Sequence, residues 1–368
     1  MSSIFELDTP TLLLDKHKMQ RNLEDIFKFA RQNGLSVRPH SKTHKSGYIA
    51  ELQQEAGAVG ITTAKIGEAE VMAHAGIRDI LIAYPVSSSI KIERLIHLLR
   101  NGTRLKIAVD QKEQLHFLQK GLEHCGEILE VWIKVNSGLN RCGVNPGKEV
   151  LSLAEQIQLL PNLKLGGIFT HAGHSYAAVS VKEIEKIGKN EGLAVSESAK
   201  LCEVNGIPIP VRSVGSTPTY KIAGKVNGIT EIRPGNAIFF DMIQVGLGVT
   251  TLENCALSVL ASVVGVYNNR IVVDTGSKIL CLDKGAHGNT TVNGFGHIVG
   301  HPNLLIERLS EEHGIVSFTG DHSLKLNDKV RIIPNHACVV VNQNEEYVVH
   351  QQNCVLETWK VDARGKVK

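Results

Sequence analysis

Short apolar runs alternate with longer amphipathic stretches through the first 240 residues of the chain. Eight runs have the length and composition of buried strands: Leu35–Val37, Val59–Ile61, Ile80–Ala83, Leu105–Val109, Val131–Val135, Leu165–Phe169, Pro210–Val214 and Ile229–Ile232. Between them apolar residues recur at helical spacing, for example in Ile90–Leu99, Gln114–Leu122, Val150–Leu159 and Val181–Glu203. Such alternation predicts a parallel sheet. Eight units in succession favour a closed (β/α)8 TIM-type barrel, although periodicity alone does not exclude an open sheet.

The pattern changes after about Phe240. The later runs are short, of β type and separated by Gly and Asn: Leu257–Val266, Arg270–Val273, Ile315–Phe318, Lys329–Ile333 and Tyr347–Val349. They predict an antiparallel β domain. We therefore expect a barrel over residues 1–240 and a β domain over 241–368, packed tightly because no flexible linker joins them. A further strand candidate, Thr9–Leu14, precedes a helix over Lys16–Gln32, and roughly the first ten residues are candidates for packing on the β domain.

Composition excludes several classes of protein. The chain has 368 residues, of which 42% are hydrophobic and 21% charged, as in an ordinary globular protein. A net charge of +3 without a basic block gives no sign of a nucleic-acid partner. No apolar run approaches the roughly 18 residues of a membrane helix, and the N-terminus lacks the features of a signal peptide. Seven scattered cysteines predict reduced thiols and a cytoplasmic location rather than a disulfide framework.

The segment Arg38–Lys45, Arg-Pro-His-Ser-Lys-Thr-His-Lys, holds the first candidate for chemistry. Pro39 removes a ladder donor, so the first barrel strand should end there and Lys42 should lie in the following loop. His40 and His44 flank that lysine two residues away on either side. We expect them to keep its amine deprotonated enough to act as a nucleophile, and the alternative is a solvated basic loop.

Other strand ends add polar groups at the mouth where such barrels bind their ligands. Gly215-Ser216-Thr217-Pro218-Thr219 and Arg233-Pro234-Gly235-Asn236 are Gly-containing turns late in the barrel, where backbone N–H groups commonly bind phosphate. Each turn by itself is more often a plain turn. Together with the lysine at another strand end, they predict a phosphorylated aldehyde bound as a Schiff base, namely pyridoxal 5′-phosphate.

The β domain contains Pro334-Asn335-His336-Ala337-Cys338. A histidine and a cysteine two residues apart on a strand point to the same face, and imidazole with thiolate suits Zn²⁺. Two protein ligands are fewer than the usual three of a catalytic zinc, so water or substrate must complete the shell. By spacing alone a buried core pair remains the commoner reading.

These motifs as a set resemble the D-threonine aldolase and D-serine dehydratase family of pyridoxal-phosphate enzymes, which have the alanine racemase-like fold. The resemblance covers about Thr9 to Gly365 and includes Arg38–Lys45, Val135–Gly143, His171–Tyr176, Gly215–Thr219, Arg233–Asn236, Leu309–Gly314 and Pro334–Cys338. One departure is Thr275, where relatives usually have alanine, and we expect little effect from it.

The resemblance implies a role for each matching residue. Lys42, rather than Lys45, would bind the cofactor covalently and act as the catalytic lysine. Arg141 would lie near the phenolic oxygen and Arg233 would face the pyridine nitrogen. The phosphate would be held by Ser216, Thr217, Gly235 and Asn236, and the site would be lined by Tyr176 and His171. His336 and Cys338 would bind a divalent metal, Zn²⁺ or Mn²⁺.

The implied activity is that of a lyase on D-β-hydroxy amino acids. A D-threonine aldolase-like retro-aldol cleavage to glycine and an aldehyde is the first expectation, and dehydration of D-serine to pyruvate and ammonia is the alternative. Amino-acid racemisation and a non-catalytic carrier of pyridoxal phosphate are weaker alternatives, because neither gives the metal pair a purpose. Relatives of this family also imply a homodimer.

Overall fold

The computed structural model describes residues 2–285 and 288–368 of the chain. Over these residues it contains an eight-stranded parallel sheet and a second, nine-stranded sheet. The strands of the parallel sheet are β2 (Ser36–Val37), β3 (Ile61–Thr63), β4 (Asp79–Ile82), β5 (Arg104–Val109), β6 (Leu129–Val135), β7 (Leu163–Thr170), β8 (Val211–Val214) and β9 (Glu231–Ile232). Each of these strands overlaps one of the eight runs predicted from the sequence.

The parallel sheet closes on itself. Its strand order is β2-β9-β8-β7-β6-β5-β4-β3, so β2 and β3 are the two ends of the series. The N–H groups of Val59 and Thr62 donate to the carbonyls of Val37 and Pro39 at 3.0 and 2.8 Å, and Ser41 N–H donates to Thr62 O at 2.8 Å. These bonds join the two ends, so the predicted barrel is confirmed and no edge is left unpaired.

Among the described residues, one helix precedes the first barrel strand and one follows each strand from β2 to β8. They are α1 (Lys16–Gln32), α2 (Gly47–Glu55), α3 (Ile66–His74), α4 (Ser89–Arg100), α5 (Lys112–Leu122), α6 (Lys148–Gln158), α7 (Val181–Val204) and α8 (Tyr220–Ala223). The side chain of Asp15 caps α1 by accepting from Lys18 N–H at 3.0 Å. Leu23, Ile26 and Phe27 of α1 are buried at the helical spacing seen in the sequence. None of the described helices is long and apolar enough to span a bilayer.

The second sheet forms the β domain. Its strands are β1 (Thr11–Asp15), β10 (Leu257–Tyr267), β11 (Arg270–Val273), β12 (His297–Ile298), β13 (Leu304–Leu309), β14 (Gly314–Phe318), β15 (Lys329–Ile333), β16 (Glu346–Gln351) and β17 (Cys354–Lys360). All its pairs are antiparallel except β1 with β16, which is parallel. Three short helices accompany them: α9 (Met242–Gly246), α10 (Ser277–Leu280) and α11 (Ala337–Gln343).

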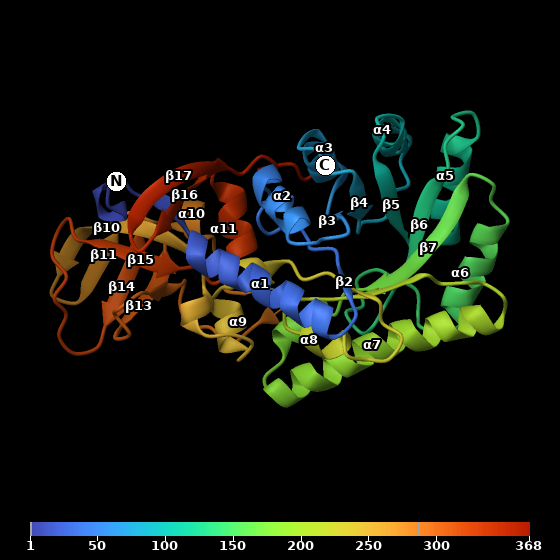
Figure 1. Cartoon of the computed structure of the whole chain (residues 1–368). Helices are drawn as coiled ribbons and strands as arrows, with labels where there is room; N and C mark the ends of the chain where they lie inside the picture. The colour runs from blue at the N-terminus through green and yellow to red at the C-terminus, as the bar shows by residue number, and fades with distance from the viewer. Residues whose placement is uncertain (1, 286–287) are drawn as a thin grey trace.

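The first strand of the chain lies in the sheet made by the last third of the sequence. Leu13 of β1 pairs with Ser258 of β10 on one side and with Val348 of β16 on the other. Barrel and β domain lie side by side, and α1 runs between them with contacts to β2 and to β16 (Figure 1). The boundary predicted at residue 240 falls between the 3-10 helix η3 (Asn236–Ile238) and α9.

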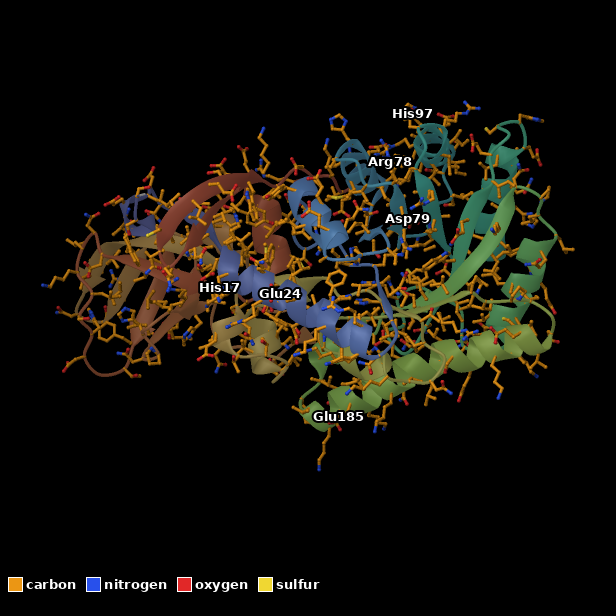
Figure 2. All side chains as sticks on the ribbon, viewed as in Figure 1. His17, Glu24, Arg78, Asp79, His97 and Glu185 are labelled. Atoms are coloured by element: carbon orange, nitrogen blue, oxygen red, sulfur yellow. The ribbon has the colours of Figure 1, made fainter. Side chains whose placement is uncertain are left out.

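The interior of the barrel contains charged side chains as well as apolar ones. Arg38 donates from Nε to Glu231 Oε2 at 3.0 Å and pairs through a terminal nitrogen with Asp79, which begins β4 (Figure 2). Lys106 Nζ lies 2.8 Å from the other oxygen of that carboxylate. All four side chains are buried, so each charge requires the partner that it has.

Candidate functional site

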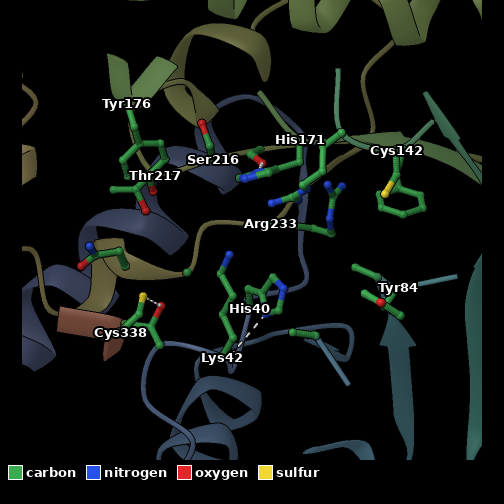
Figure 3. A pocket seen from close by; sticks show the side chains of 18 of the residues that line it. His40, Lys42, Tyr84, Cys142, His171, Tyr176, Ser216, Thr217, Arg233 and Cys338 are labelled. Carbon is green, nitrogen blue, oxygen red and sulfur yellow. Dashed lines mark hydrogen bonds between the residues drawn. The ribbon is translucent and has the colours of Figure 1, made fainter. Parts of the chain in front are cut away.

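A cavity of about 470 Å³ opens at the barrel mouth and extends to the β domain. Every site residue predicted from the sequence lines it: Lys42, Arg141, His171, Tyr176, Ser216, Thr217, Arg233, Gly235, Asn236, His336 and Cys338. These residues come from loops after five different barrel strands and from the β domain (Figure 3). No Asp or Glu side chain is among the described residues that line the cavity. The cavity is therefore suited to anionic ligands.

Lys42 and Lys45 have different environments, although they lie in the same loop. Lys42 is partly buried and lines the cavity. The ammonium of Lys45 lies 2.6 Å from Glu68 Oε1 and donates to Ala363 O at 3.3 Å, with both partners of the ion pair buried. Lys45 is thus committed to a structural ion pair, and Lys42 is the lysine available for chemistry.

Only one of the two flanking histidines faces the cavity. His40 lines it, and its Nδ1 accepts from Lys42 N–H at 3.3 Å. Burial, and then the charge of Lys42, lower the pKa of His40 well below its ordinary value. His44 is buried elsewhere, with Nδ1 accepting from Ser46 N–H, and burial lowers its pKa to about 4. The expectation that imidazoles flank Lys42 on both sides is wrong for His44, because the turn directs that ring away from the cavity.

Hydroxyl groups from two loops form one side of the cavity. Ser216 Oγ lies 3.2 Å from Ser175 Oγ and 2.8 Å from Thr219 Oγ1. The backbone N–H groups of Ser216 and Gly235 donate to no other described residue. A Cβ at Gly235 would come 3.2 Å from His40 Cβ, so any larger residue there would press on His40. Unpartnered N–H groups beside hydroxyls are what a bound phosphate requires, so these residues fit the predicted cofactor.

Glu191, which sequence reasoning missed, holds the two hydroxyl-bearing loops together. Its Oε1 accepts from Ala172 N–H at 3.2 Å and Gly215 N–H at 3.0 Å, and its Oε2 accepts from Thr219 Oγ1 at 2.5 Å. Burial raises the pKa of this carboxyl. The carboxyl belongs to α7, where Gly192 allows Val226 to pass within 2.5 Å of its Cβ position. The two glycines inside the predicted helix, Gly188 and Gly192, were the sequence signal of close packing there.

Arg233 is fixed by contacts on the inner wall of the barrel. One terminal nitrogen donates to Ser213 Oγ at 2.5 Å and the other donates to Thr170 O. Ser213 in turn donates to Glu231 Oε1 at 2.6 Å, which connects Arg233 to the buried ion network of Arg38. Burial lowers the pKa of Arg233 to about 10, which leaves it charged at neutral pH. The guanidinium is therefore held by the barrel with part of its surface on the cavity.

The loop that carries Arg141 is shaped by a single amide side chain. Asn136 Oδ1 accepts from the N–H groups of Gly138 and Asn140 at 3.1 and 3.0 Å. Asn140 has a φ of 53°, a left-handed conformation that asparagine tolerates better than most residues. This turn brings Arg141 to the cavity.

The pair His336 and Cys338 lies beside the cavity, but not on a strand. β15 ends at Ile333, Pro334 follows, and α11 begins at Ala337 with His336 as its N-cap residue. The prediction that both residues share a strand face is therefore wrong. Both side chains nevertheless line the cavity, and each shifts the pKa of the other.

The pair has the donor chemistry of a metal site. His336 Nδ1 lies 2.8 Å from Asp283 Oδ2, so Nε2 is the ring nitrogen that could bind a metal. Cys338 Sγ lies 3.1 Å from Thr43 Oγ1 of the barrel. Burial by itself would raise the pKa of the thiol, but the nearby His336 and Lys42 outweigh it and lower that pKa. Among the described residues no group of three ligands forms, so water or substrate would complete the shell.

Comparison with known proteins identifies the family of the chain. The family "Alanine racemase, N-terminal domain" matches residues 14–242, and the "Putative serine dehydratase domain" matches residues 256–350. D-threo-3-hydroxyaspartate dehydratase of Delftia sp. (strain HT23) is 32% identical over 97% of this chain and 98% of its own length. The chain belongs to the D-threonine aldolase and D-serine dehydratase family. Members of this family similar to the chain are named as aldolases and dehydratases, so the protein is a lyase.

The chain is also similar to another relative and to solved structures. 3-Hydroxy-D-aspartate aldolase of Paracoccus denitrificans (strain Pd 1222) is 30% identical over 98% of this chain and 93% of its own length. The crystal structure of D-threonine aldolase from Filomicrobium marinum has a TM-score of 0.92 at 28% identity, covering 99% of this chain and 98% of that one. Alanine racemase of Clostridium difficile 630 has a TM-score of 0.71 at 14% identity, which shows the fold alone.

Several residues of the cavity were not among the site residues predicted from the sequence. They are Thr43, Ala64, Lys65, Ala83, Tyr84, Lys134, Cys142 and Phe169. Tyr84 directly follows Ala83 at the end of the predicted strand Ile80–Ala83, and Lys65 follows the predicted strand Val59–Ile61 by four residues. Their places at strand ends were the available signal, since loops after barrel strands line the mouth.

Proposed function

We propose that this protein is a pyridoxal-phosphate- and divalent-metal-dependent lyase acting on D-β-hydroxy amino acids. One observation carries the proposal: a single cavity holds Lys42, the hydroxyl-lined turn at Ser216 and Thr217, and the pair His336 and Cys338. No simpler function would need a nucleophilic amine, an anion-binding turn and a metal-binding pair in one cavity. The similar proteins act, by their names, on D-serine, D-threonine or 3-hydroxyaspartate.

Each side chain then has a defined task. Lys42 Nζ would hold the cofactor aldehyde and could move a proton at the substrate Cα. Ser216, Thr217 and the N–H of Gly235 hold the phosphate, while Glu191 keeps their loops in place. His336 and Cys338 would hold the metal. Pyridoxal phosphate, when bound, supplies an electron sink for charge developing at Cα, and the divalent ion supplies a Lewis acid for the β-hydroxyl.

Dehydration is the first candidate, because D-threo-3-hydroxyaspartate dehydratase is 32% identical to the chain. Solved structures of D-threo-3-hydroxyaspartate dehydratase include a histidine-to-alanine mutant and, in the metal-free form, a cysteine-to-alanine mutant, at positions two apart. His336 and Cys338 have the same spacing. In this course Lys42 removes the α-proton and the β-hydroxyl leaves as water. Hydrolysis of the resulting enamine gives a 2-oxo acid and ammonia.

Retro-aldol cleavage is the second candidate. It is favoured by the similarity to 3-hydroxy-D-aspartate aldolase and D-threonine aldolase. Here the proton of the β-hydroxyl is removed, the Cα–Cβ bond breaks, and the products are an aldehyde and glycine. Both courses need the same cavity and differ in which proton leaves first.

The test is a parallel incubation of the purified protein with D-serine, D-threonine and D-threo-3-hydroxyaspartate. We expect ammonia and a 2-oxo acid from a dehydratase, and glycine with an aldehyde from an aldolase. The protein should absorb at about 420 nm, as this cofactor generally does when it is bound to a lysine. Lys42→Ala should lose this band and the activity, whereas Lys45→Met should keep the band. Retention of both band and activity in Lys42→Ala would refute the proposal.

We also propose that the protein is a homodimer, as the resemblance to its family implies. Light scattering on the eluted peak should then give about twice the chain mass of 40.1 kDa. A mass of one chain would contradict this proposal without affecting the chemistry.

A further inference from the structure

Lys65 is a cationic residue of the cavity for which the proposed function has no task. It lies between β3 and α3, at the N-cap position of that helix. Its ammonium lies 3.9 Å from the centroid of the Tyr84 ring, which follows β4. Lys65 and Tyr84 both line the cavity. A cation on an aromatic face is held in place without being neutralised.

The nearest acidic residue on α3 cannot serve as a counter-ion for Lys65. Glu68 Oε1 is 2.6 Å from Lys45 Nζ, and Glu68 Oε2 accepts from the N–H groups of Ala64 and Lys65 at 2.7 and 3.2 Å. These bonds fix the backbone of Lys65 and use both carboxylate oxygens. Among the described residues Lys65 has no ion pair, and no acidic side chain lines the cavity. A half-buried ammonium in such surroundings lacks a negative partner, which a ligand can provide.

The position of Lys65 determines which part of a bound ligand its ammonium can contact. The barrel order places β2 between β9 and β3, so Lys42 lies between the phosphate-type turns after β8 and β9 and the residues after β3 and β4. Figure 3 shows Tyr84 on the opposite side of Lys42 from Thr217 and Tyr176. If Thr217 holds the phosphate, the side of Lys42 that faces Tyr84, and with it Lys65, would be left for the substrate.

We infer that Lys65, seated on Tyr84, binds the α-carboxylate of the amino-acid substrate. This inference rests on the proposed function, because the cofactor fixes where the substrate amine lies. The α-carboxylate is the one anion that every candidate substrate shares. A lysine ammonium on a flexible stem can follow it as the side chain at Cβ varies. Lys65 is thus a substrate-binding residue that serves both the dehydratase and the aldolase course.

Lys91 provides a matched control. Its ammonium lies 5.9 Å from the same Tyr84 ring, but Lys91 is not among the residues that line the cavity. Lys65→Met and Lys91→Met each remove one ammonium near Tyr84 while keeping a similar stem. Lys65→Arg retains the charge and tests for rescue.

The experiment compares two ligands that differ only at the carboxylate. D-alanine has no β-hydroxyl and cannot be dehydrated or cleaved, and D-alaninol has a hydroxymethyl group in place of the carboxylate. Their affinities for the cofactor-loaded protein are measured from the change in its absorption at about 420 nm. In Lys65→Met we expect D-alanine to bind on the order of 10- to 100-fold more weakly and D-alaninol less than about threefold. Lys91→Met should bind both ligands as the wild type does, and Lys65→Arg should recover part of the D-alanine affinity.

Three results would overturn the inference: an unchanged D-alanine affinity in Lys65→Met, equal losses for the two ligands, or an equal loss in Lys91→Met. In each case the wild type still shows the absorption band and lyase products, so the proposed function stands. A wild type without the band overturns both proposals at once.

Discussion

The contrast between Lys42 and Lys45 leads to the sharpest prediction about stability. Lys45 and Glu68 are 6% and 2% exposed, and their charged atoms are 2.6 Å apart. Lys45→Met keeps the aliphatic stem but leaves the carboxylate buried without its cation. Breaking a buried ion pair by removing one partner typically costs about 3–5 kcal/mol. Because two backbone N–H groups still donate to Glu68 Oε2, we expect the lower end, about 3 kcal/mol.

This loss converts to a shift in melting temperature. Unfolding entropy is about 2.1 cal/mol/K per residue, and for a 368-residue chain that unfolds as one unit it amounts to about 0.8 kcal/mol/K. A loss of about 3 kcal/mol then lowers the melting temperature by about 4 °C. Scanning calorimetry on wild type and Lys45→Met at neutral pH measures the difference directly.

A second variant tests whether the unpaired charge of Glu68 causes the loss of stability. Lys45→Met combined with Glu68→Gln removes the charge and keeps an oxygen that can accept from Ala64 and Lys65, so it should recover most of the lost stability. The cofactor absorption should survive in both variants. A Lys45→Met protein that melts within about 1 °C of the wild type would refute the assigned ion pair. Loss of the absorption band in that variant would instead show that Lys42 has been wrongly chosen as the catalytic lysine.

Three further predictions concern pH, the arginine at the cofactor and the metal. His44 has a folded-state pKa of about 4, below its ordinary 6.5. The unfolded chain therefore binds more protons at this residue between these values, so His44 alone should contribute about 2 kcal/mol to the loss of stability from pH 7 to pH 5; calorimetry at both pH values should find a fall smaller by about this amount in His44→Asn. Ser213→Ala removes one of the acceptors that hold Arg233 and should raise the cofactor dissociation constant about 5- to 10-fold. Ser198→Ala also loses a buried hydroxyl but should leave this dissociation constant unchanged. Chelation should abolish turnover without removing the absorption band at about 420 nm. Full activity in the presence of a chelator would exclude the metal role.

The arrangement of the barrel could be predicted because its strands are mostly apolar and are buried on both faces. Runs such as Leu105–Val109 and Val131–Val135 are buried by helices outside and by side chains inside, so they stand out in the sequence. Strands of the β domain with one exposed face were harder to find. β13 (Leu304–Leu309) and β17 (Cys354–Lys360) were missed, since charged residues such as Glu307 and Glu357 interrupt their apolar pattern.

The candidate site was predictable where chemistry depends on position in a loop after a strand. Lys42, Arg141 and Ser216 follow strands directly and could be placed at the barrel mouth. Glu191 could not, because its role depends on which face of a 24-residue helix meets two distant loops. Lys65 was missed for a similar reason: its lack of a counter-ion becomes visible only when Glu68 is seen to be occupied by Lys45.

The place of β1 between β10 and β16 has a consequence for how the two halves of the site move. The chain crosses from the β domain into the barrel after Asp15 and returns after Phe240, so the halves are tethered by two covalent connections rather than one. A single tether would permit a hinge, whereas a double one restricts the rotation of one half against the other. Opening of the gap between Lys42 and Cys338 is thereby limited, and ligand entry should depend on loop motion instead. A fragment that begins after β1 would lose this restraint even though every residue of the cavity is retained.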